Sequence, residues 1–586
     1  MKYKLSLSED TKKMWSILSS VKRFFPLLAD EKWKLIITLI AVLTNSLSSL
    51  ASPILIGYTI DHYIQWKDFH GVLVNAWILL AIYIIGSWAS YIQTKTMGGV
   101  GRRLLFSIRN TIFNKLQELP IDFFNQNKSW DLISRINNDT DKLNQFMSQA
   151  LMQFVWNFFL ISWTGIFILF LDFQLALVAL FPAVLVLIIT LLLSPWVKRK
   201  NLESLQTIGG VSSDIQESLS NFKVILAFNR LDYFRQKFRE SNEKNYKTSI
   251  WSGIASNIFT PIYGFASHLA SLLSLFFGLY LITHWNLTIG LVISFQLYVT
   301  NFYTPLRQLA SVWASFQLAL ASLDRVWEVL SLQSDILVLP STGMVATDSV
   351  LEFRNVSFHY PDGDMILHDI NFSLEEWKTY ALVGPTGGGK TTTASLMARL
   401  YDPTGGTIFL HGKDIRTYEP DERTKKIGFI LQEPFLFSGT LRENILYGND
   451  TYLEHTSEQL IGVLKQYDLL DFVSRFEWWL DAKIVTSSES MSLGQKQIIA
   501  FIRAFLRNPE LLILDEATAN IDTVTEQLLE EILQKLPQKT TKVVIAHRLN
   551  TIKNADEIFF VNSGSITVTG SMENALEMIL HWKRDS

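Results

Sequence analysis

Long apolar segments fill roughly the first 325 residues of the chain, whereas apolar and polar positions are more evenly mixed after them. A helix needs about 20 mostly apolar residues to cross a bilayer. Six segments reach this length, at residues 35–58, 72–94, 145–171, 174–197, 251–282 and 287–318. The pattern therefore predicts six membrane-spanning helices.

The joins between these segments come in two lengths. Residues 171–174 and 283–286 leave room only for tight turns between antiparallel helices. The second and third segments, and the fourth and fifth, are joined by about 50 polar residues with heptad-like apolar spacing. We expect these long joins to be helices that continue out of the membrane, and residues 13–29 to form an amphipathic helix on its surface.

Lys and Arg are concentrated before the first segment and in the two long joins, while the short joins hold almost none. Positive residues flanking membrane helices stay on the cytoplasmic side. Both termini and both long joins are therefore expected in the cytoplasm. The first thirty residues mix acidic, basic and aromatic residues and do not have the pattern of a cleavable signal.

Charge and composition exclude several classes of protein. The formal net charge is −3, and no basic stripe with interleaved aromatic residues is present, so a nucleic-acid partner is not expected. The absence of cysteine excludes disulfides, thiol catalysis and cysteine metal sites. No Asp or Glu lies between Trp251 and Ala321, so an acidic proton or sodium relay is not expected in the last two segments.

Two sets of side chains in the spans stand out, and His268 in the first of them either contacts a transported compound or forms a hydrogen bond between helices. Polar residues are few: Asn45, Gln153, Asn157, His268, Gln296, Asn301 and Arg307. The aromatic residues of the last two spans either line a cavity or face lipid and other helices: Phe259, Tyr263, Phe295, Tyr298, Phe302 and Tyr303. The sequence leaves these alternatives open.

The chain changes character at residues 331–349, a linker marked by Ser, Pro and Gly. We therefore divide it into a membrane domain (1–330), the linker, and an α/β domain (350–586). A buried-strand pattern at 380–383 is followed by a glycine-rich loop and a helix, the order that a phosphate-binding loop requires. The loop consists of Gly384, Pro385, Thr386, Gly387, Gly388, Gly389, Lys390 and Thr391.

Each residue type in this loop is suited to binding a phosphate group or its Mg²⁺ ion. Glycines let backbone amides curl around phosphates, Lys390 adds positive charge, and Thr391 offers a hydroxyl to Mg²⁺. Thr392 follows as the first residue of the helix.

A second apolar strand ends at Asp515, which can hold the Mg²⁺ shell if it lies beside the phosphate loop. Glu516 follows it and can accept a proton from the attacking water. His547 comes after another apolar strand and is expected near the terminal phosphate.

With these features in order, the chain resembles the ATP-binding cassette (ABC) exporters over essentially its whole length. Tyr360 matches the aromatic residue that stacks on adenine, and Gln432 matches the loop glutamine that senses Mg²⁺ and the membrane domain. Asp522 matches the dimer-contact loop and His547 the switch histidine. The stretch from Phe123 to Arg135 is similar to the first intracellular loop with its coupling helix, and residues 220–223 lie where the second coupling region is expected.

The resemblance implies a type I exporter fold: six helices with cytoplasmic extensions, followed by an α/β P-loop nucleotide-binding domain, in two halves that cross over. It implies ATP and Mg²⁺ as cofactors, with Lys390, Gln432, Glu516 and His547 as catalytic residues. Thr391, Gln432 and Asp515 would hold the metal. Residues 491–495 align with the signature segment, so Ser492, Gly494 and Gln495 would contact the partner's ATP.

The signature segment departs from the family pattern Leu-Ser-Gly-Gly-Gln, because Met491 replaces its leucine and Leu493 its first glycine. A branched side chain there should crowd the phosphate, and one lost phosphate donor costs about 3–4 kcal/mol of transition-state stabilisation. A homodimer would have two altered sites. We therefore expect a heterodimer, whose second half-transporter chain has an intact signature and a defective catalytic carboxylate.

The expected function is ATP-driven efflux of hydrophobic or amphipathic small molecules across a bacterial plasma membrane, in contact with membrane lipid. A lipid flippase, a peptide exporter and a homodimer of the same architecture remain alternatives. The six spans exclude a soluble ABC ATPase, and the complete hydrolytic set argues against a non-transporting regulator or channel.

Overall fold

Two compact units make up the structure, a computed structural model. The helical unit comprises the described parts of Leu5–Gln117 and Ser129–Ser331, and the α/β unit holds residues 3–4, 118–128 and those after 331. The structure describes residues 3–5, 31–285, 287–334, 336–340, 343, 347–361, 363–474, 480–484, 491–515, 521–545, 554–569, 573–574 and 577–578. The predicted surface helix at 13–29 lies outside these residues.

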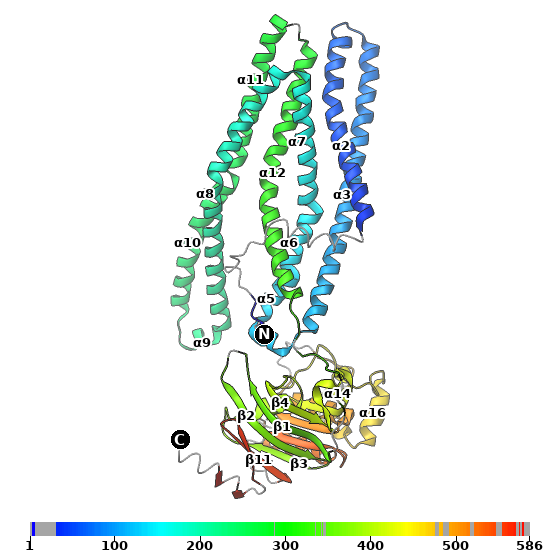
Figure 1. Cartoon of the computed structure of the whole chain (residues 1–586), viewed down its shortest axis with the longest axis vertical. Coiled ribbons are helices and arrows are strands. Elements are labelled where there is room, and N and C mark those ends of the chain that lie inside the picture. The colour runs from blue at the N-terminus through cyan, green and yellow to red at the C-terminus, as the bar shows by residue number, and fades with distance from the viewer. Residues whose placement is uncertain are drawn as a thin grey trace. The chain divides into compact units, whose positions relative to one another are not determined.

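Long helices dominate the helical unit (Figure 1). Between them lie short helices and three π-helical turns, labelled η2, η3 and η4. In chain order the elements are α2 (Lys32–Thr59), η2 (Ile60–Ile64), α3 (Phe69–Gln117), α5 (Ser129–Ser134), η3 (Arg135–Asp139), α6 (Thr140–Gln145), η4 (Phe146–Ala150), α7 (Leu151–Leu171), α8 (Phe173–Ser220), α9 (Phe222–Ala227), α10 (Leu231–Asn257), α11 (Phe259–Trp285) and α12 (Ile289–Leu330).

Five stretches of the described residues are long and apolar enough to cross a membrane: Lys32–Ile64, Phe69–Gln117, Ser129–Leu171, Phe173–Ser220 and Leu231–Thr283. They contain the first five predicted spans. The sixth, residues 287–318, lies in α12, where several side chains are outside the described part, so the number six stays a prediction.

The predicted joins are helical, as expected. α3 continues without a break to Gln117, and α8 to Ser220. The tight turn after α7 is confirmed as well. Asp172 lies between α7 and α8, and the Oδ1 atom of Asp172 accepts a hydrogen bond of 2.8 Å from the backbone N–H of Leu175. This cap satisfies an N–H group that has no partner within the helix.

Small residues let α2 and α12 approach closely. A Cβ atom added at Gly57 would lie 2.6 Å from the backbone oxygen of Gly290. The Ser294 hydroxyl donates to the Pro53 carbonyl at 2.6 Å, and the Gly290 N–H donates to Asp61 Oδ1 at 2.8 Å. Contacts between small and polar residues replace the hydrophobic effect as the cause of helix association in a bilayer.

A charged cluster joins the segment around η3 to the end of α12. Arg135 is 1% exposed, and its guanidinium contacts Asp131 Oδ2 at 3.1 Å and Glu328 Oε2 at 2.7 Å. Arg325 bridges to Asp131 at 3.0 Å and to Asp139 at 3.3 Å. These pairs fix the two segments relative to each other.

The α/β unit contains a four-stranded sheet, a six-stranded sheet and a two-stranded ribbon (Figure 1). Its elements are α4 (Ile121–Gln126), β1 (Ser349–His359), β2 (Met365–Glu375), β3 (Thr379–Val383), α13 (Lys390–Met397), β4 (Gly405–Leu410), β5 (Lys413–Asp414), η5 (Ile415–Thr417), α14 (Pro420–Lys426), β6 (Ile427–Ile430), β7 (Gly439–Thr440), α15 (Leu441–Ile445), α16 (Ser457–Gln466), α17 (Leu470–Ser474), β8 (Lys483–Ile484), α18 (Leu493–Arg507), β9 (Leu511–Asp515), α19 (Thr523–Gln534), β10 (Thr541–Ile545), β11 (Glu557–Asn562) and β12 (Ser565–Val568).

The larger sheet has the order β12-β11-β3-β10-β9-β6, in which β11, β3, β10, β9 and β6 are parallel. All five residues of β9 are buried, which explains its continuous apolar sequence up to Asp515. Because the strands are parallel, their carboxyl ends lie at one edge of the sheet. Ligands of such sheets bind at this edge.

Residues 118–128 belong to the α/β unit, although they lie between two long helices of the helical unit in the sequence. The coupling helix is expected between Phe123 and Arg135, a stretch that contains α5 and part of α4, and α4 belongs to the α/β unit. Its Asn125 side-chain N–H donates a hydrogen bond of 2.9 Å to the hydroxyl of Tyr401, and Phe123 is completely buried. The chain of the membrane half thus contributes a short helix to the α/β unit.

We expect Arg135→Ala to cost about 3–5 kcal/mol, because it leaves the Glu328 carboxylate without its buried partner and removes one of the two arginines that pair with Asp131. The readout is the melting temperature of the purified chain, which should fall by several degrees. Arg199→Ala is the matched control: Arg199 pairs with Glu203 at 3.1 Å but is 79% exposed, so its loss should leave the melting temperature nearly unchanged. Equal losses in both variants would contradict this prediction.

Candidate functional site

The phosphate-loop sequence follows β3 and leads into α13, as predicted, but the helix begins at Lys390, two residues before the predicted start at Thr392. Gly384, Gly387 and Gly389 have φ values of 145°, 83° and 110°, a region that side-chain-bearing residues rarely adopt. A Cβ atom at Gly384 would lie 2.0 Å from the Val561 carbonyl oxygen, and one at Gly388 would lie 2.6 Å from it. Glycine is therefore required both by backbone conformation and by contact with β11.

Lys390, Thr391 and Asp515 lie together at the start of α13. The ammonium group of Lys390 is buried and donates hydrogen bonds to the carbonyls of Gly384 and Pro385, at 3.0 and 2.9 Å. The Thr391 hydroxyl donates to Asp515 Oδ1 at 3.2 Å. A cation, a hydroxyl and a carboxylate thus converge at the N-terminus of α13, where the first N–H groups have no partner within the helix, an arrangement suited to a phosphate group and a divalent cation.

A cavity of about 490 Å³ opens over this loop, lined among others by Thr386, Gly387, Gly389, Lys390, Thr391 and Thr392. The β11–β12 turn closes one side of the cavity with Ser563 and Gly564, and the Gly564 N–H donates to the Gly388 carbonyl at 3.4 Å. Sequence reasoning missed this turn. The Asn-Ser-Gly stretch at 562–564, between two apolar strands, is the signal that could have indicated it.

The other expected residues at this edge follow neighbouring strands. Gln432 is exposed and comes two residues after the end of β6. Glu516 and His547 lie outside the described residues; the strands that precede them end at Asp515 and Ile545, which are paired in register.

Tyr360 lies directly after β1 within an aromatic cluster. Its hydroxyl is 3.3 Å from Thr392 Oγ1, and its ring makes an edge contact with Tyr401 at a centroid distance of 5.2 Å. Burial raises the pKa of Tyr401 to about 12, so its hydroxyl remains protonated near neutral pH. Tyr401 therefore contacts both Tyr360, the residue expected to stack on adenine, and Asn125 of α4.

The altered signature segment forms the N-terminus of α18. Ser492 is the N-cap: its Oγ accepts a hydrogen bond of 3.2 Å from the Gln495 N–H, and the Gln495 side chain accepts one of 2.9 Å from the Ser492 N–H. This capping box leaves the hydroxyl proton of Ser492 free to donate. Leu493, half-buried, is the first helical residue.

Gly494 and Asp522 have structural roles that the sequence did not reveal. A Cβ atom at Gly494 would lie 2.7 Å from Thr525 Cγ2, so this glycine permits α18 to pack against α19. Asp522 caps α19 by accepting hydrogen bonds from the Thr525 N–H at 2.9 Å and the Thr525 hydroxyl at 2.7 Å. The N–H bond is the main reason that the pKa of Asp522 lies below its usual value.

The aromatic residues of the last two spans are largely structural. Phe295, Tyr298 and Tyr303 are at most 2% exposed and belong to the core between helices. The Tyr303 hydroxyl donates to the Ala179 carbonyl at 2.7 Å, and that of Tyr298 donates to the Leu50 carbonyl. The sequence left open whether the aromatic residues line a cavity or face lipid and other helices. These three residues contact other helices.

We expect Gly384→Ala to weaken nucleotide binding tenfold or more, because relieving the overlap with Val561 requires backbone strain of about 1–3 kcal/mol. Binding is measured with a fluorescent ATP analogue. Gly462→Ala is the control: no atom lies within 4 Å of its added Cβ, and it lies within α16. It should leave binding unchanged and stabilise the helix by about 0.5–1 kcal/mol. Unimpaired binding by Gly384→Ala would refute the required contact.

Two family models match this chain. The model described as ABC transporter transmembrane region matches residues 35–306, and the model described as ABC transporter matches residues 367–519. The first match covers the first five predicted spans and residues 287–306 of the sixth, and the second contains the phosphate loop, the signature segment and Asp515.

Curated relatives match nearly the whole chain. An uncharacterised ABC transporter ATP-binding protein of Bacillus subtilis (strain 168) is 32% identical over 98% of this chain and 94% of its own length. An ATP-dependent lipid A-core flippase of Syntrophus aciditrophicus (strain SB) is 30% identical, covering 91% of this chain and 88% of the relative. A multidrug resistance ABC transporter ATP-binding and permease protein of Lactococcus lactis subsp. lactis (strain IL1403) is 28% identical, covering 94% and 93%. Because membrane region and ATP-binding domain match together in one chain, this protein belongs to the ABC transporter family, as an exporter-type half-transporter that couples ATP hydrolysis to transport.

Proposed function

We propose that the chain exports hydrophobic or amphipathic compounds as one half of a heterodimer with one competent and one degenerate ATP site. Exporters of this family work as dimers. The multidrug resistance relative supports the proposed substrate class, while the flippase at 30% identity favours lipid as the second candidate.

Leu493 is the observation that carries the heterodimer. It is the first residue of α18, where helix amides would approach the terminal phosphate of the partner's ATP. Ser492 keeps a hydroxyl proton for that phosphate, but the half-buried Leu493 side chain adds bulk where the family has glycine. Two copies of this chain would have this obstruction at both sites, whereas a partner with an intact signature would complete one good site.

In the competent site, Glu516 is the proposed base that orients the attacking water, and His547 contacts the terminal phosphate. Lys390 would neutralise phosphate charge from its buried position, and Tyr360 would stack on adenine. Thr391, Asp515 and Gln432 would hold Mg²⁺, which supplies electrostatic stabilisation of the phosphate oxygens. The 3.2 Å contact between Thr391 and Asp515 supports this metal assignment.

Closure of the nucleotide-binding domains on two ATP molecules would drive the change from inward-facing to outward-facing cavity, and hydrolysis would reset it. The domain boundaries 1–330, 331–349 and 350–586 are supported by the end of α12 at Leu330 and the start of β1 at Ser349. The Lys and Arg distribution and the bacterial relatives support a bacterial plasma membrane with both termini in the cytoplasm.

ATPase turnover tests the heterodimer. The chain alone should hydrolyse ATP slowly, and a partner with an intact signature should restore turnover. Glu516→Gln should then lower the turnover of the pair by about 100-fold or more, because only one site retains a general base. Robust activity of the chain alone, abolished by Glu516→Gln, would mean a working homodimer and would contradict the proposed heterodimer with one competent and one degenerate ATP site.

Metal dependence tests the role of Asp515. We expect Asp515→Asn to raise the Mg²⁺ concentration for half-maximal ATPase by about tenfold, because one carboxylate charge of the metal shell is lost. Asp450→Asn serves as the control, since Asp450 is an exposed residue that pairs with Lys425 at 2.9 Å. An unchanged Mg²⁺ requirement in Asp515→Asn would argue against this metal assignment.

A further inference from the structure

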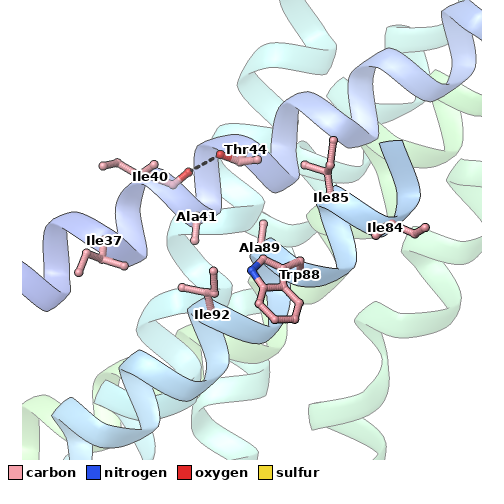
Figure 2. A pocket seen from close by; sticks show the side chains of 9 residues that line it. All are labelled: Ile37, Ile40, Ala41, Thr44, Ile84, Ile85, Trp88, Ala89 and Ile92. Carbon is pink, nitrogen blue, oxygen red and sulfur yellow. Dashed lines mark hydrogen bonds between the residues drawn. The ribbon is translucent and has the colours of Figure 1, made fainter. Parts of the chain in front are cut away.

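The helix pair α2 and α3 has two different sides. One side carries an apolar groove of about 480 Å³, which Figure 2 shows between Ile37, Ile40, Ala41 and Thr44 of α2 and the α3 residues Ile84, Ile85, Trp88, Ala89 and Ile92. Among the described residues that line this groove, the only polar side-chain groups are the Trp88 indole N–H and the Thr44 hydroxyl, which donates to the Ile40 carbonyl of its own helix at 2.9 Å. Such a surface suits contact with lipid acyl chains.

The other side carries what we call the polar groove, formed by two adjoining cavities of about 450 and 340 Å³. It is lined by α2 between Asn45 and Ser52, by α3 between Ile82 and Thr94, and by η4 and α7 between Ser148 and Trp156. On α3, Tyr83, Ser87, Ser90 and Thr94 lie at helical spacing on the face opposite to Ile84, Ile85, Trp88 and Ile92. Polar and apolar groups are thus sorted between two faces of one helix.

Four carboxamide side chains line the larger cavity of the polar groove or its junction with the smaller one: Asn45, Gln93, Gln149 and Gln153. None of them has a hydrogen-bond partner among the described residues. The groove's hydroxyl groups on α2 differ, since Ser48, Ser49 and Ser52 each donate to the carbonyl four residues earlier in α2. At membrane depth an unpaired amide is costly, so these groups require water, protein or a ligand opposite them.

Asn157 extends this pattern into the interior. It follows Gln153 by one helical turn on α7 and is completely buried. Both polar atoms of its side chain lack a hydrogen-bond partner within the described part of the chain. The set of unpaired amides therefore continues from Gln149 through Gln153 to a fully buried position.

The chemistry of the groove restricts what it can bind. None of the described residues that line it is Asp, Glu, Lys, Arg or His. A charged group would therefore be desolvated without a counter-charge. Carboxamides both donate and accept hydrogen bonds, as do sugar hydroxyls and amides, and Trp156 adds an indole N–H and an aromatic face.

From these observations we propose that the polar groove is a substrate site for the uncharged, hydrogen-bonding part of an amphipathic compound, such as a sugar or amide headgroup. The inference rests on the proposed export function and specifies its substrate class. The apolar tail of the compound would remain in contact with lipid, while the headgroup satisfies the amides of α2, α3 and α7.

Equilibrium binding to the full-length chain, paired with a partner of intact signature in phosphatidylcholine nanodiscs, tests the site. The neutral probe is a fluorescent C6-glucosylceramide, and the charged probes are C6-phosphatidylserine with the same fluorophore and tetraphenylphosphonium as a competitor. We expect the neutral probe to bind saturably and to be displaced by neither charged compound. Gln149→Leu combined with Gln153→Leu should raise its Kd about tenfold, the effect of two lost neutral hydrogen bonds.

Two matched controls place the effect in the groove. Trp156→Leu changes the polar groove and should weaken binding of the neutral probe, whereas Trp88→Leu makes the same change in the apolar groove and should not. Thr44→Val, which removes a hydroxyl from the apolar groove, should also leave the Kd within twofold. The double glutamine variant should keep its melting temperature or gain stability, since leucine is favoured in a membrane helix.

Three outcomes would overturn the inference. The first is that a charged probe binds more tightly than the neutral probe. The second is that the neutral probe does not bind although ATPase dependent on Glu516 is intact. The third is that the double glutamine variant no longer forms the dimer. The last would identify the groove as an interface between two chains. Absence of ATPase dependent on Glu516 in the unmodified chain paired with a partner of intact signature would instead refute the proposed function, so the two failures are distinguishable.

Discussion

Polar groups within a bilayer have no water to bind, and this constraint shapes the whole helical unit. Backbone groups are satisfied by long helices, and several serine and threonine hydroxyls, such as those of Ser48 and Thr44, donate to carbonyls of their own helix. Where α2 meets α12, glycines permit the Ser294 and Asp61 contacts that a larger side chain would prevent. The same constraint makes the unpaired amides near Gln153 informative, because hydrocarbon cannot satisfy them.

A different constraint governs the α/β unit, namely the parallel arrangement of its central strands. Strands far apart in the sequence must end at the same edge, so Lys390, Asp515 and Gln432 follow three strands of one sheet. Close contact of the phosphate loop with Val561 then fixes the curvature of the loop. Sheet topology therefore brings these residues to one edge, and their side chains then supply the chemistry of the site.

Much of this arrangement could be predicted from the sequence, because local patterns carry it. Apolar length predicted the first five spans, and strand, glycine-rich loop and helix predicted the phosphate loop. Residues that depend on tertiary packing escaped prediction. Asn45 and Gln153 were recognised singly, but nothing local shows that α2 and α7 turn them toward Gln93. Likewise, the burial of Tyr298 and Tyr303 depends on carbonyls of Leu50 and Ala179, on other helices.

The packing of Gly494 has a consequence for how such sequences are compared. Its absent side chain makes room for Thr525 within the same domain, so selection for folding alone would preserve this glycine. A degenerate ATP site can then retain the second glycine of its signature long after losing the ability to support hydrolysis. Leu493, which lies at the helix terminus outside that packing contact, is free to diverge. Among related chains, variation at position 493 should therefore report on lost activity, whereas identity at position 494 reports only on an intact fold.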